Sequence, residues 1–383
     1  MSKKVGIITL NGYKNYGNRL QNYALQESIK SLGFSVDTIL TDVAKNKDEE
    51  AISIDGNKLK RLLTIEGIKK IIPKSQEILL KKKNKKYIME RTRKFKAFSK
   101  DHLSEKLYSA DEKNMPRNID DKYDFFVVGS DQVWNPSYIH GSELYFLKFA
   151  SKEKRIAYAP SFGASFIPDE YTEKYKRGLS GLNCLSVREE AGAKLIKDLT
   201  GKEAQVVLDP TMLLSKENWQ SMMKPAKNKP KQSYLLTYFL GEVNKETKKT
   251  INEIAAKNNF KIVNLADIKS KDYYSSDPSE FIDFINSASI FFTDSFHGAV
   301  FSVILQKSFV VFDRVGKLPS MNSRIETLLS LLDLESRHYR NIQKNDDILT
   351  IDYSHVAPVL ETNRKKSLDY LSVSLGAKQG LTL

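Results

Sequence analysis

The side chain best suited to proton transfer in this sequence is His297, which lies where a predicted strand gives way to a predicted helix. The apolar run 290–293 is typical of a buried strand, and the apolar spacing that follows predicts a helix over 296–306. Ser295 is a suitable N-cap, and the free N–H groups of a first helical turn attract anions. His297 is therefore a candidate acid or anion-binding group, although a histidine at a helix start is often only a cap or a satisfied polar group.

Polar side chains also follow two other predicted strands. Asp131 comes after the strand at 123–128, and it could deprotonate a hydroxyl or simply be a turn residue or helix cap. Trp134 could offer an apolar face to a sugar ring, or it could be a core aromatic. Arg188 directly follows the strand at 184–187. Its guanidinium could grip a carboxylate or phosphate, or it could pair at the surface with a neighbouring glutamate.

The composition is that of a globular protein with more than one core. The chain has 383 residues, 40% of them hydrophobic, so two domains are expected. It contains no run of 18 apolar residues and does not begin with a secretory signal, so we expect a cytoplasmic protein. The single cysteine, Cys184, lies in an apolar run and is expected to pack in the core.

Most of the net charge of +14 comes from one segment. Residues 58–106 hold 17 Lys or Arg against 5 Asp or Glu, a surplus of 12. This weakly amphipathic stretch could be a solvated helical insertion, or it could contact an anionic membrane surface or a lipid-linked acceptor. Nucleic acid is not expected as a partner, because Tyr87, Phe95 and Phe98 form no stacking module.

Apolar runs alternate with helical patterns along the whole chain, which predicts mainly parallel sheets. Strands are predicted at residues 5–10, 34–40, 123–128, 155–159, 184–187, 205–208, 234–240, 261–265, 290–293 and 309–312, and helices at about 20–32, 244–258, 278–288, 296–306 and 322–333. The lysine- and proline-containing stretch 224–231 is a predicted linker.

The resulting prediction is an α/β chain of two Rossmann-like, doubly wound domains that face a cleft. The first spans residues 1–225 and carries the basic insertion around 58–106. The second spans 226–345, and the extension 346–383 is expected to pack back on the first domain. The first loop, residues 11–18, has neither the GxGxxG nor the Walker spacing, so no dinucleotide or P-loop site is predicted.

Five segments, in order, resemble the polysaccharide pyruvyl transferase family. They are NYGNRLQNYAL, VVGSDQVWNP, SVREEAGA, VLDPT and FTDSFHGAVFSVILQKSFVVF. The resemblance implies a fold like that of GT-B glycosyltransferases. It also implies transfer of the pyruvyl group of phosphoenolpyruvate onto two sugar hydroxyls as a cyclic ketal, during cell-surface polysaccharide synthesis. Phosphoenolpyruvate would be the donor substrate, no cofactor is implied, and the acceptor would be a lipid- or nucleotide-linked sugar.

The resemblance also assigns roles to residues. Arg188 and His297 match the family's donor-binding positions, whereas Ser295 stands where some members have an arginine. A second cation would then come from Arg314 or Arg324. The full donor set is Arg188, Ser295, His297, Gly298, Arg314 and Arg324; the acceptor set is Asn18, Arg19, Gln21, Gln132 and Trp134; and the catalytic pair is His297 and Asp131.

Two other functions fit the same features. A glycosyltransferase of the same architecture that uses a nucleotide sugar would fit the two-domain cleft and the serine at position 295. A basic surface-binding protein with a vestigial cleft would fit the charged segment. No Asp-x-Asp, HExxH or Cys/His cluster appears, so no catalytic metal is expected.

Overall fold

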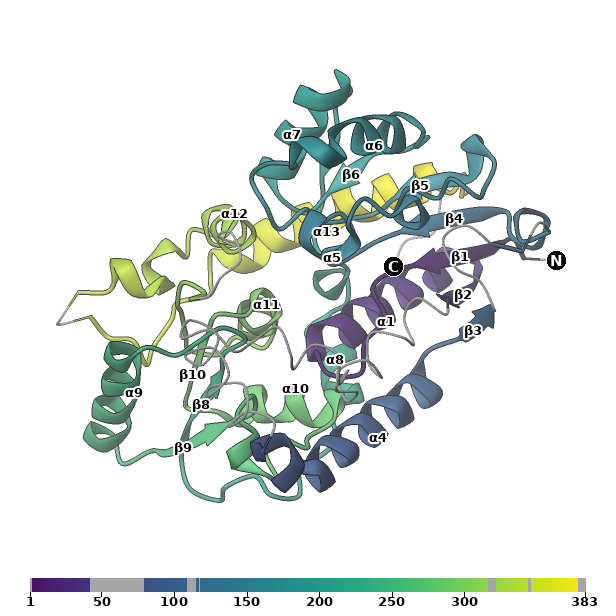
Figure 1. Cartoon of the computed structure of the whole chain (residues 1–383). Coiled ribbons are helices and arrows are strands. Elements are labelled where there is room, and N and C mark those ends of the chain that lie inside the picture. The colour runs from purple at the N-terminus through teal and green to yellow at the C-terminus, as the bar shows by residue number, and fades with distance from the viewer. Residues whose placement is uncertain are drawn as a thin grey trace, which may run out of the picture.

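Two parallel sheets organise the protein. The computed structural model describes residues 2–41, 79–108, 115–116, 118–315, 322–343 and 346–377. A five-stranded sheet in the N-terminal half has the order β3-β2-β1-β4-β5, and a four-stranded sheet in the C-terminal half has the order β11-β10-β8-β9 (Figure 1). All pairings in both sheets are parallel, which confirms the predicted α/β fold with two Rossmann-like units.

The N-terminal unit contains helices on both faces of its sheet. Its strands are β1 (Lys4–Ile8), β2 (Ser35–Thr41), β3 (Glu105–Tyr108), β4 (Phe125–Val128) and β5 (Arg155–Ala157), with a small parallel pair of β6 (Ser186–Val187) and β7 (Gln205–Val206). Its helices are α1 (Tyr16–Ser31), α4 (Lys85–His102), α5 (Pro136–Ile139), α6 (Asp169–Ser180), α7 (Glu190–Thr200) and α8 (Lys216–Met222). Ile7 packs in the cluster that includes Leu20 of α1, whereas Val128 packs with Leu179 of α6.

The C-terminal unit repeats this plan. Its strands are β8 (Tyr234–Tyr238), β9 (Lys261–Asn264), β10 (Ile290–Thr293) and β11 (Phe309–Val311), and its helices are α9 (Lys245–Lys257), α10 (Pro278–Ser287), α11 (Phe296–Ile304) and α12 (Ser323–Leu331). Leu235 and Phe292 pack in the cluster with α9, whereas Leu236 and Phe291 pack with α10 and α11. Strands buried on both faces are continuously apolar, which is why they were recognisable in the sequence.

Each predicted strand and helix is present, and its ends differ from the prediction by up to four residues: most strands stop before the apolar run does, whereas the first helix begins at Tyr16, four residues before the predicted start. Strand β3 was not predicted. It lies at the end of the basic segment, and only its pairing with β2, with Thr38 opposite Glu105, makes it a strand. Its burial pattern is half-exposed, so the sequence carries little signal for it.

The last helix, α13 (Val356–Ser374), returns to the N-terminal unit. Ser367 Oγ accepts from the Leu208 amide at 3.0 Å, Arg364 Nε donates to the Met212 carbonyl at 2.9 Å, and Tyr370 Oη donates to the Ala157 carbonyl at 2.9 Å. The domain boundaries at residues 225 and 345 themselves stay a prediction.

Helix α4 joins the two units along one side (Figure 1). Arg91 is 3% exposed and donates to Tyr16 Oη at 2.7 Å and to the Lys14 carbonyl at 2.9 Å, both in the N-terminal unit. It also donates to the Tyr274 carbonyl of the C-terminal unit. The Tyr16 ring stacks on Phe281 with centroids 4.3 Å apart, so one buried cation and one aromatic pair fasten the units together.

Only part of the basic segment lies within the described residues. Positions 58–78 fall outside them, and residues 79–106 form the helical region of α4 and the start of β3. None of the helices described in the structure is long and apolar enough to cross a membrane.

The first prediction concerns Arg91. Replacing it by methionine should lower the free energy of unfolding by about 2 to 4 kcal/mol, because buried carbonyl and hydroxyl groups of both units lose their donor. Urea unfolding would measure this. Arg93→Met is the matched control on the same helix, since Arg93 is exposed and its ion pair within the described residues is with the neighbouring Glu90, and it should leave stability near that of the wild type. Equal effects of the two substitutions would contradict the role given to Arg91.

Candidate functional site

The candidate site is built from residues that follow the carboxyl ends of parallel strands. Asp131 follows β4, Arg188 follows β6, Asp209 follows β7 and His297 follows β10. The turn after β4 needs Gly129, whose φ is 122° and where a Cβ would overlap the Tyr158 carbonyl. The topology thus brings side chains from distant positions to one edge of each sheet, and the two edges face each other.

His297 lies in the first turn of α11, as the sequence predicted. Ser295 is the N-cap: its Oγ accepts from the Gly298 amide at 3.3 Å, and its own amide donates to Thr293 Oγ1 at 3.0 Å. The Ser295 hydroxyl and the Gly298 amide are therefore occupied by the cap itself. The imidazole of His297 lies against Gly17 at the start of α1, where any Cβ would overlap the ring.

The centre of the site is a carboxylate that the sequence analysis did not select. Asp209 has a fully buried side chain, and its Oδ2 lies 2.5 Å from Arg188 Nη1 and 3.5 Å from His297 Nε2. Ser130 Oγ donates to the same oxygen at 3.1 Å. Asp209 precedes a proline at the end of an apolar run, and this strand-end position, shared with Asp131, was the available signal.

The two carboxylates of the site are strongly perturbed. Burial alone would raise the pKa of Asp209, but the nearby His297 and Arg188 outweigh it and hold that pKa far below its usual range. The pKa of Asp131 is also lowered, since the same two cationic groups again overcome the effect of burial. Both groups are therefore ionised at neutral pH, which balances the buried cations.

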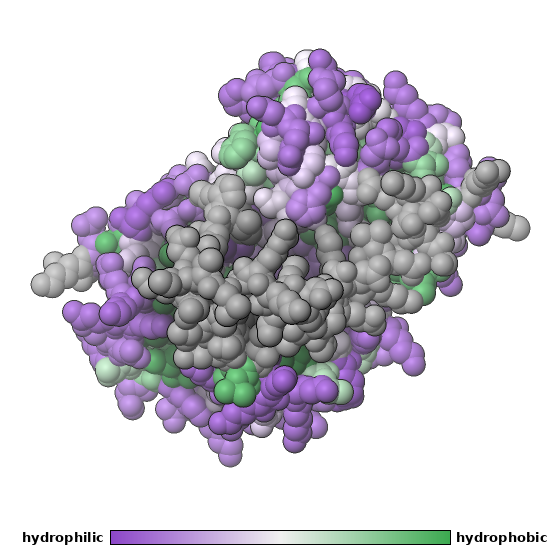
Figure 2. All heavy atoms as spheres, viewed as in Figure 1, coloured by the Kyte–Doolittle hydropathy of each residue, from purple (hydrophilic) through white to green (hydrophobic). Residues whose placement is uncertain are grey.

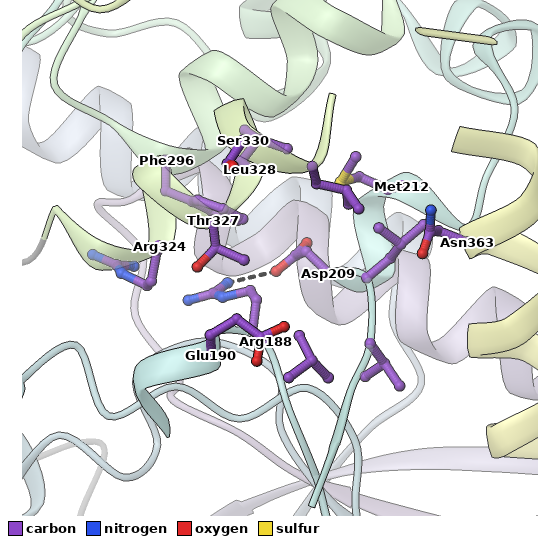
Figure 3. Close-up of a pocket in the computed structure, with 14 residues that line it drawn as sticks. Arg188, Glu190, Asp209, Met212, Phe296, Arg324, Thr327, Leu328, Ser330 and Asn363 are labelled. Carbon is purple, nitrogen blue, oxygen red and sulfur yellow. Dashed lines mark hydrogen bonds and ion pairs between the residues drawn. The ribbon is translucent and has the colours of Figure 1, made fainter. Parts of the chain in front are cut away.

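Two guanidinium groups border one cavity (Figure 3). Arg188 and Arg324 lie against the Phe296 ring, with their Cζ atoms 4.4 and 5.7 Å from its centroid. Burial, and then the charge of Arg188, lowers the pKa of Arg324 to about 10. Nε of both arginines and Nη2 of Arg188 are buried and have no hydrogen-bond partner among the described residues. The cavity measures about 310 Å³, and its remaining wall is mostly apolar, with Met212 and Leu328.

Arg314, the other candidate for a second cation, is placed differently. Its Nε lies 3.4 Å from Asp294 Oδ2, and its Nη2 donates to the Asp294 carbonyl at 3.2 Å. Asp294 in turn accepts from the amides of Leu240 and Gly241 at 2.7 Å each. Arg314 thus stabilises the loop after β8 through its contacts with Asp294. It is not among the residues that line the cavity with Arg188 and Arg324.

The residues predicted for the acceptor are largely engaged within the protein. Asn18 Nδ2 donates to Asp131 Oδ2 at 3.1 Å, so Asn18 does reach the site. Arg19 is fully buried and pairs with Glu105 at 2.8 Å. Gln21 is also fully buried and bonds to Thr9 and to the Ser130 amide, at 3.0 and 3.1 Å. Both side chains hold the loops around Asp131, and their direct contact with an acceptor stays a prediction.

Two further acceptor candidates are also reassigned. Trp134 is fully buried, its ring is stacked with Phe146, and its Nε1 donates to the Tyr145 carbonyl at 2.9 Å, so it is a core aromatic and offers no face to a sugar. Gln132 lies beside Arg324. With its amide oxygen turned to the guanidinium, it accepts from Nη1 and Nη2 at 3.2 and 3.1 Å, so it contacts one of the two arginines that border the cavity.

The part of the chain that the structure describes contains no recognisable metal-binding site. His, Cys, Asp and Glu side chains there do not form a group of three or more that could hold an ion. The site instead holds the carboxylates of Asp131 and Asp209, the guanidinium groups of Arg188 and Arg324 and the imidazole of His297, with Glu190 also in the cavity wall. Guanidinium groups beside an imidazole suit the binding of an anion with acid–base help.

Comparison with known sequences identifies the family. The pattern of the polysaccharide pyruvyl transferases matches residues 15–314, well over half of the chain. The chain belongs to this family. Pyruvyl transferases are transferases, so the protein is an enzyme of that class, and the matched range contains every candidate site residue except Arg324. A search of curated proteins finds no match.

Solved structures with a similar trace include two epimerases of UDP-N-acetylglucosamine and MurG. They include a candidate UDP-N-acetylglucosamine 2-epimerase from Listeria monocytogenes (11% identity, 94% of this chain and 95% of that one, TM-score 0.44). A UDP-GlcNAc 2-epimerase from Neisseria meningitidis, bound to UDP-GlcNAc, has 11% identity over 96% and 99% of the chains and a TM-score of 0.41. MurG from Acinetobacter baumannii has 9% identity over 98% and 96%, with a TM-score of 0.36. At these scores the likeness carries no argument about activity.

The second prediction concerns the contact between α1 and α11. Gly17→Ala should lower the free energy of unfolding by about 1 to 3 kcal/mol, because the added Cβ overlaps the His297 ring and must push it away. Helix propensity alone would favour alanine by about 1 kcal/mol, so the sign of the effect is informative. Gly12→Ala, which meets no atom within 4 Å, is the control and should be nearly neutral in the same urea titration. A Gly17→Ala protein more stable than the wild type would contradict the close contact.

Proposed function

We propose that this family member transfers the pyruvyl group of phosphoenolpyruvate to two hydroxyls of a sugar, as a cyclic ketal, during the synthesis of a cell-surface polysaccharide. The observation that carries the proposal is the cavity beside Arg188 and Arg324, where buried guanidinium N–H groups lack partners among the described residues. Phosphoenolpyruvate carries a carboxylate and a phosphate, and two guanidinium groups match two anionic groups. Both phosphoenolpyruvate and nucleotide sugars are cytoplasmic metabolites, so we place the reaction in the cytoplasm.

The charged groups can be assigned to steps of this reaction. A proton adds to the methylene carbon of the enol, which becomes the methyl group, while the first sugar oxygen bonds to the central carbon and loses its own proton. The C–O bond to phosphate then breaks, the second sugar oxygen closes the ketal, and the proton of that second hydroxyl leaves with the phosphate, so that two protons are released and two are taken up. His297 supplies a proton or a hydrogen bond to the departing phosphate. Asp131 accepts the hydroxyl proton. Its lowered pKa makes it a weak base, so proton removal would accompany bond formation.

The third prediction tests the donor. Phosphoenolpyruvate at about 100 times its dissociation constant should stabilise the wild type by roughly 2.7 kcal/mol, visible as a rise in Tm. Arg188→Ala and His297→Ala should abolish or strongly reduce this rise, because they remove the groups that contact the anion. Arg177→Ala, an exposed arginine on α6, is the control and should keep it.

Free phosphate and UDP-sugars are the ligand controls in the same experiment. Stabilisation by a nucleotide sugar but not by phosphoenolpyruvate would replace the proposal with a glycosyltransferase. Phosphate release from phosphoenolpyruvate that depends on a sugar acceptor would support transfer itself.

We further propose that the basic segment brings the enzyme to an anionic membrane surface, where a lipid-linked acceptor would lie. Lys82, Lys83, Lys85 and Lys86 are all exposed, and Met89 on the following turn is 60% exposed. The opposite side of α4 is buried through Phe95 and other residues. On the coloured part of the face drawn in Figure 2, hydrophobic side chains lie in small separate areas among hydrophilic ones. Charge would therefore dominate such a contact.

The fourth prediction is a vesicle-binding experiment. Replacing Lys82, Lys83, Lys85 and Lys86 by glutamine should weaken binding to phosphatidylcholine vesicles that contain phosphatidylglycerol, measured by sedimentation, by on the order of a thousandfold, since each cation near anionic lipid contributes about 1 kcal/mol. The matched control carries the same change at four exposed lysines of α9: Lys245, Lys248, Lys249 and Lys257. Equal loss in both variants, or equal binding to pure phosphatidylcholine, would overturn the proposal.

A further inference from the structure

The Asp209 carboxylate is held from several directions. Its Oδ1 accepts from the Thr211 amide at 3.0 Å and from Thr211 Oγ1 at 2.6 Å. Its Oδ2 accepts from Ser130 Oγ and Arg188 Nη1, and it faces His297 Nε2. Asp209 also caps the 3-10 turn Pro210–Met212, so its backbone is fixed as well as its side chain. Such a group has little freedom to move.

The contact with Arg188 leaves a particular part of the guanidinium open. Asp209 takes Nη1, whereas Nε and Nη2 are the two buried nitrogens without partners among the described residues. The closest carboxylate to Nη2, that of Asp131, lies 3.9 Å away, beyond hydrogen-bond range. The N–H groups on Nε and Nη2 point the same way and form a fork that fits a carboxylate or phosphate. Figure 3 shows the end of the Arg188 guanidinium away from Asp209 directed toward Thr327 in the cavity wall.

The same carboxylate also connects the two units. Asp209 and Arg188 belong to the N-terminal unit, and His297 belongs to α11 of the C-terminal unit. His297 is confined on its other side by Gly17. One anionic group therefore lies between the arginine and the histidine that the proposed reaction requires.

We infer that Asp209 is a positioning residue: it turns the Nε–Nη2 fork of Arg188 toward the cavity and holds the His297 ring opposite it. The inference rests on the proposed function only for the identity of the ligand. A positioning role predicts that removing the Asp209 charge weakens anion binding, which is the opposite of the effect expected from charge attraction alone. Removing a negative charge from an anion site should strengthen anion binding, whereas loss of the positioning contact should weaken it.

The fifth prediction uses this difference in sign. Asp209→Asn should weaken phosphoenolpyruvate binding, measured by titration calorimetry, by at least about tenfold, as expected when one charge-assisted contact is lost. Asp283→Asn is the control. Asp283 is another buried carboxylate, paired with Lys229 at 2.6 Å and with the Ala226 amide, but it lies on α10 and does not touch the site. Its variant should bind the donor as the wild type does.

A milder substitution tests the same contact if the Asp209→Asn protein does not fold. Thr211→Val removes the 2.6 Å hydrogen bond to Asp209 Oδ1 and leaves the charge, so it should weaken binding in the same direction by a smaller factor. Unchanged or tighter binding of phosphoenolpyruvate to both variants, with a wild type that binds it, would overturn the inference.

A second readout does not need the donor. The imidazole ¹⁵N resonances of His297, assigned through His297→Gln among the five histidines, should shift in Asp209→Asn and stay in place in Asp283→Asn. A wild type that does not bind phosphoenolpyruvate would refute the proposed function. The ¹⁵N spectrum would still show whether Asp209 contacts His297. His297 resonances that do not respond to Asp209→Asn would refute the positioning role.

Discussion

The site depends on how two carboxylates compensate buried arginines. Arg188 and Arg324 are each only 4% exposed, and a charge removed from water is costly unless another charge or strong hydrogen bonds compensate it. Asp209 and Asp131 lie within ion-pair range of Arg188, yet N–H groups of the two arginines have no partner in the described part of the chain. The proposed anion site rests on this incomplete compensation.

The rest of the fold keeps these charges together. Strands β4, β6, β7 and β10 end at the site. Only β6 and β7 pair with each other, whereas β4 and β10 belong to the five- and four-stranded sheets, so the packing of the sheets against one another brings these carboxyl ends together. The two units could still separate, but Arg91 hydrogen-bonds to both of them and Tyr16 stacks on Phe281. These contacts place the start of α1 directly against α11, and so confine His297.

Several features were predictable because they depend on local sequence. Buried parallel strands are continuous apolar runs, and Ser295 before an apolar helix marks an N-cap. His297 and Arg188 stood at strand ends, where ligands bind in such folds. Trp134 and Arg19 were assigned to an acceptor because residue type alone does not reveal burial: a tryptophan can face a ligand or fill a core, and an arginine can be buried when a carboxylate such as Glu105 lies opposite it.

The sequence by itself determined the family, the α/β class, most of the strands along the chain and two residues, Arg188 and His297, that both contact Asp209 in the site. Tertiary structure alone decided that Asp209 lies between them, that Arg324 and not Arg314 shares the cavity with Arg188, and that α4 joins the units. The physical reason is the distance along the chain over which each kind of interaction acts. Hydrophobic periodicity and capping act over a few residues, whereas the pairing of a charge depends on which distant strand ends the fold brings within 4 Å.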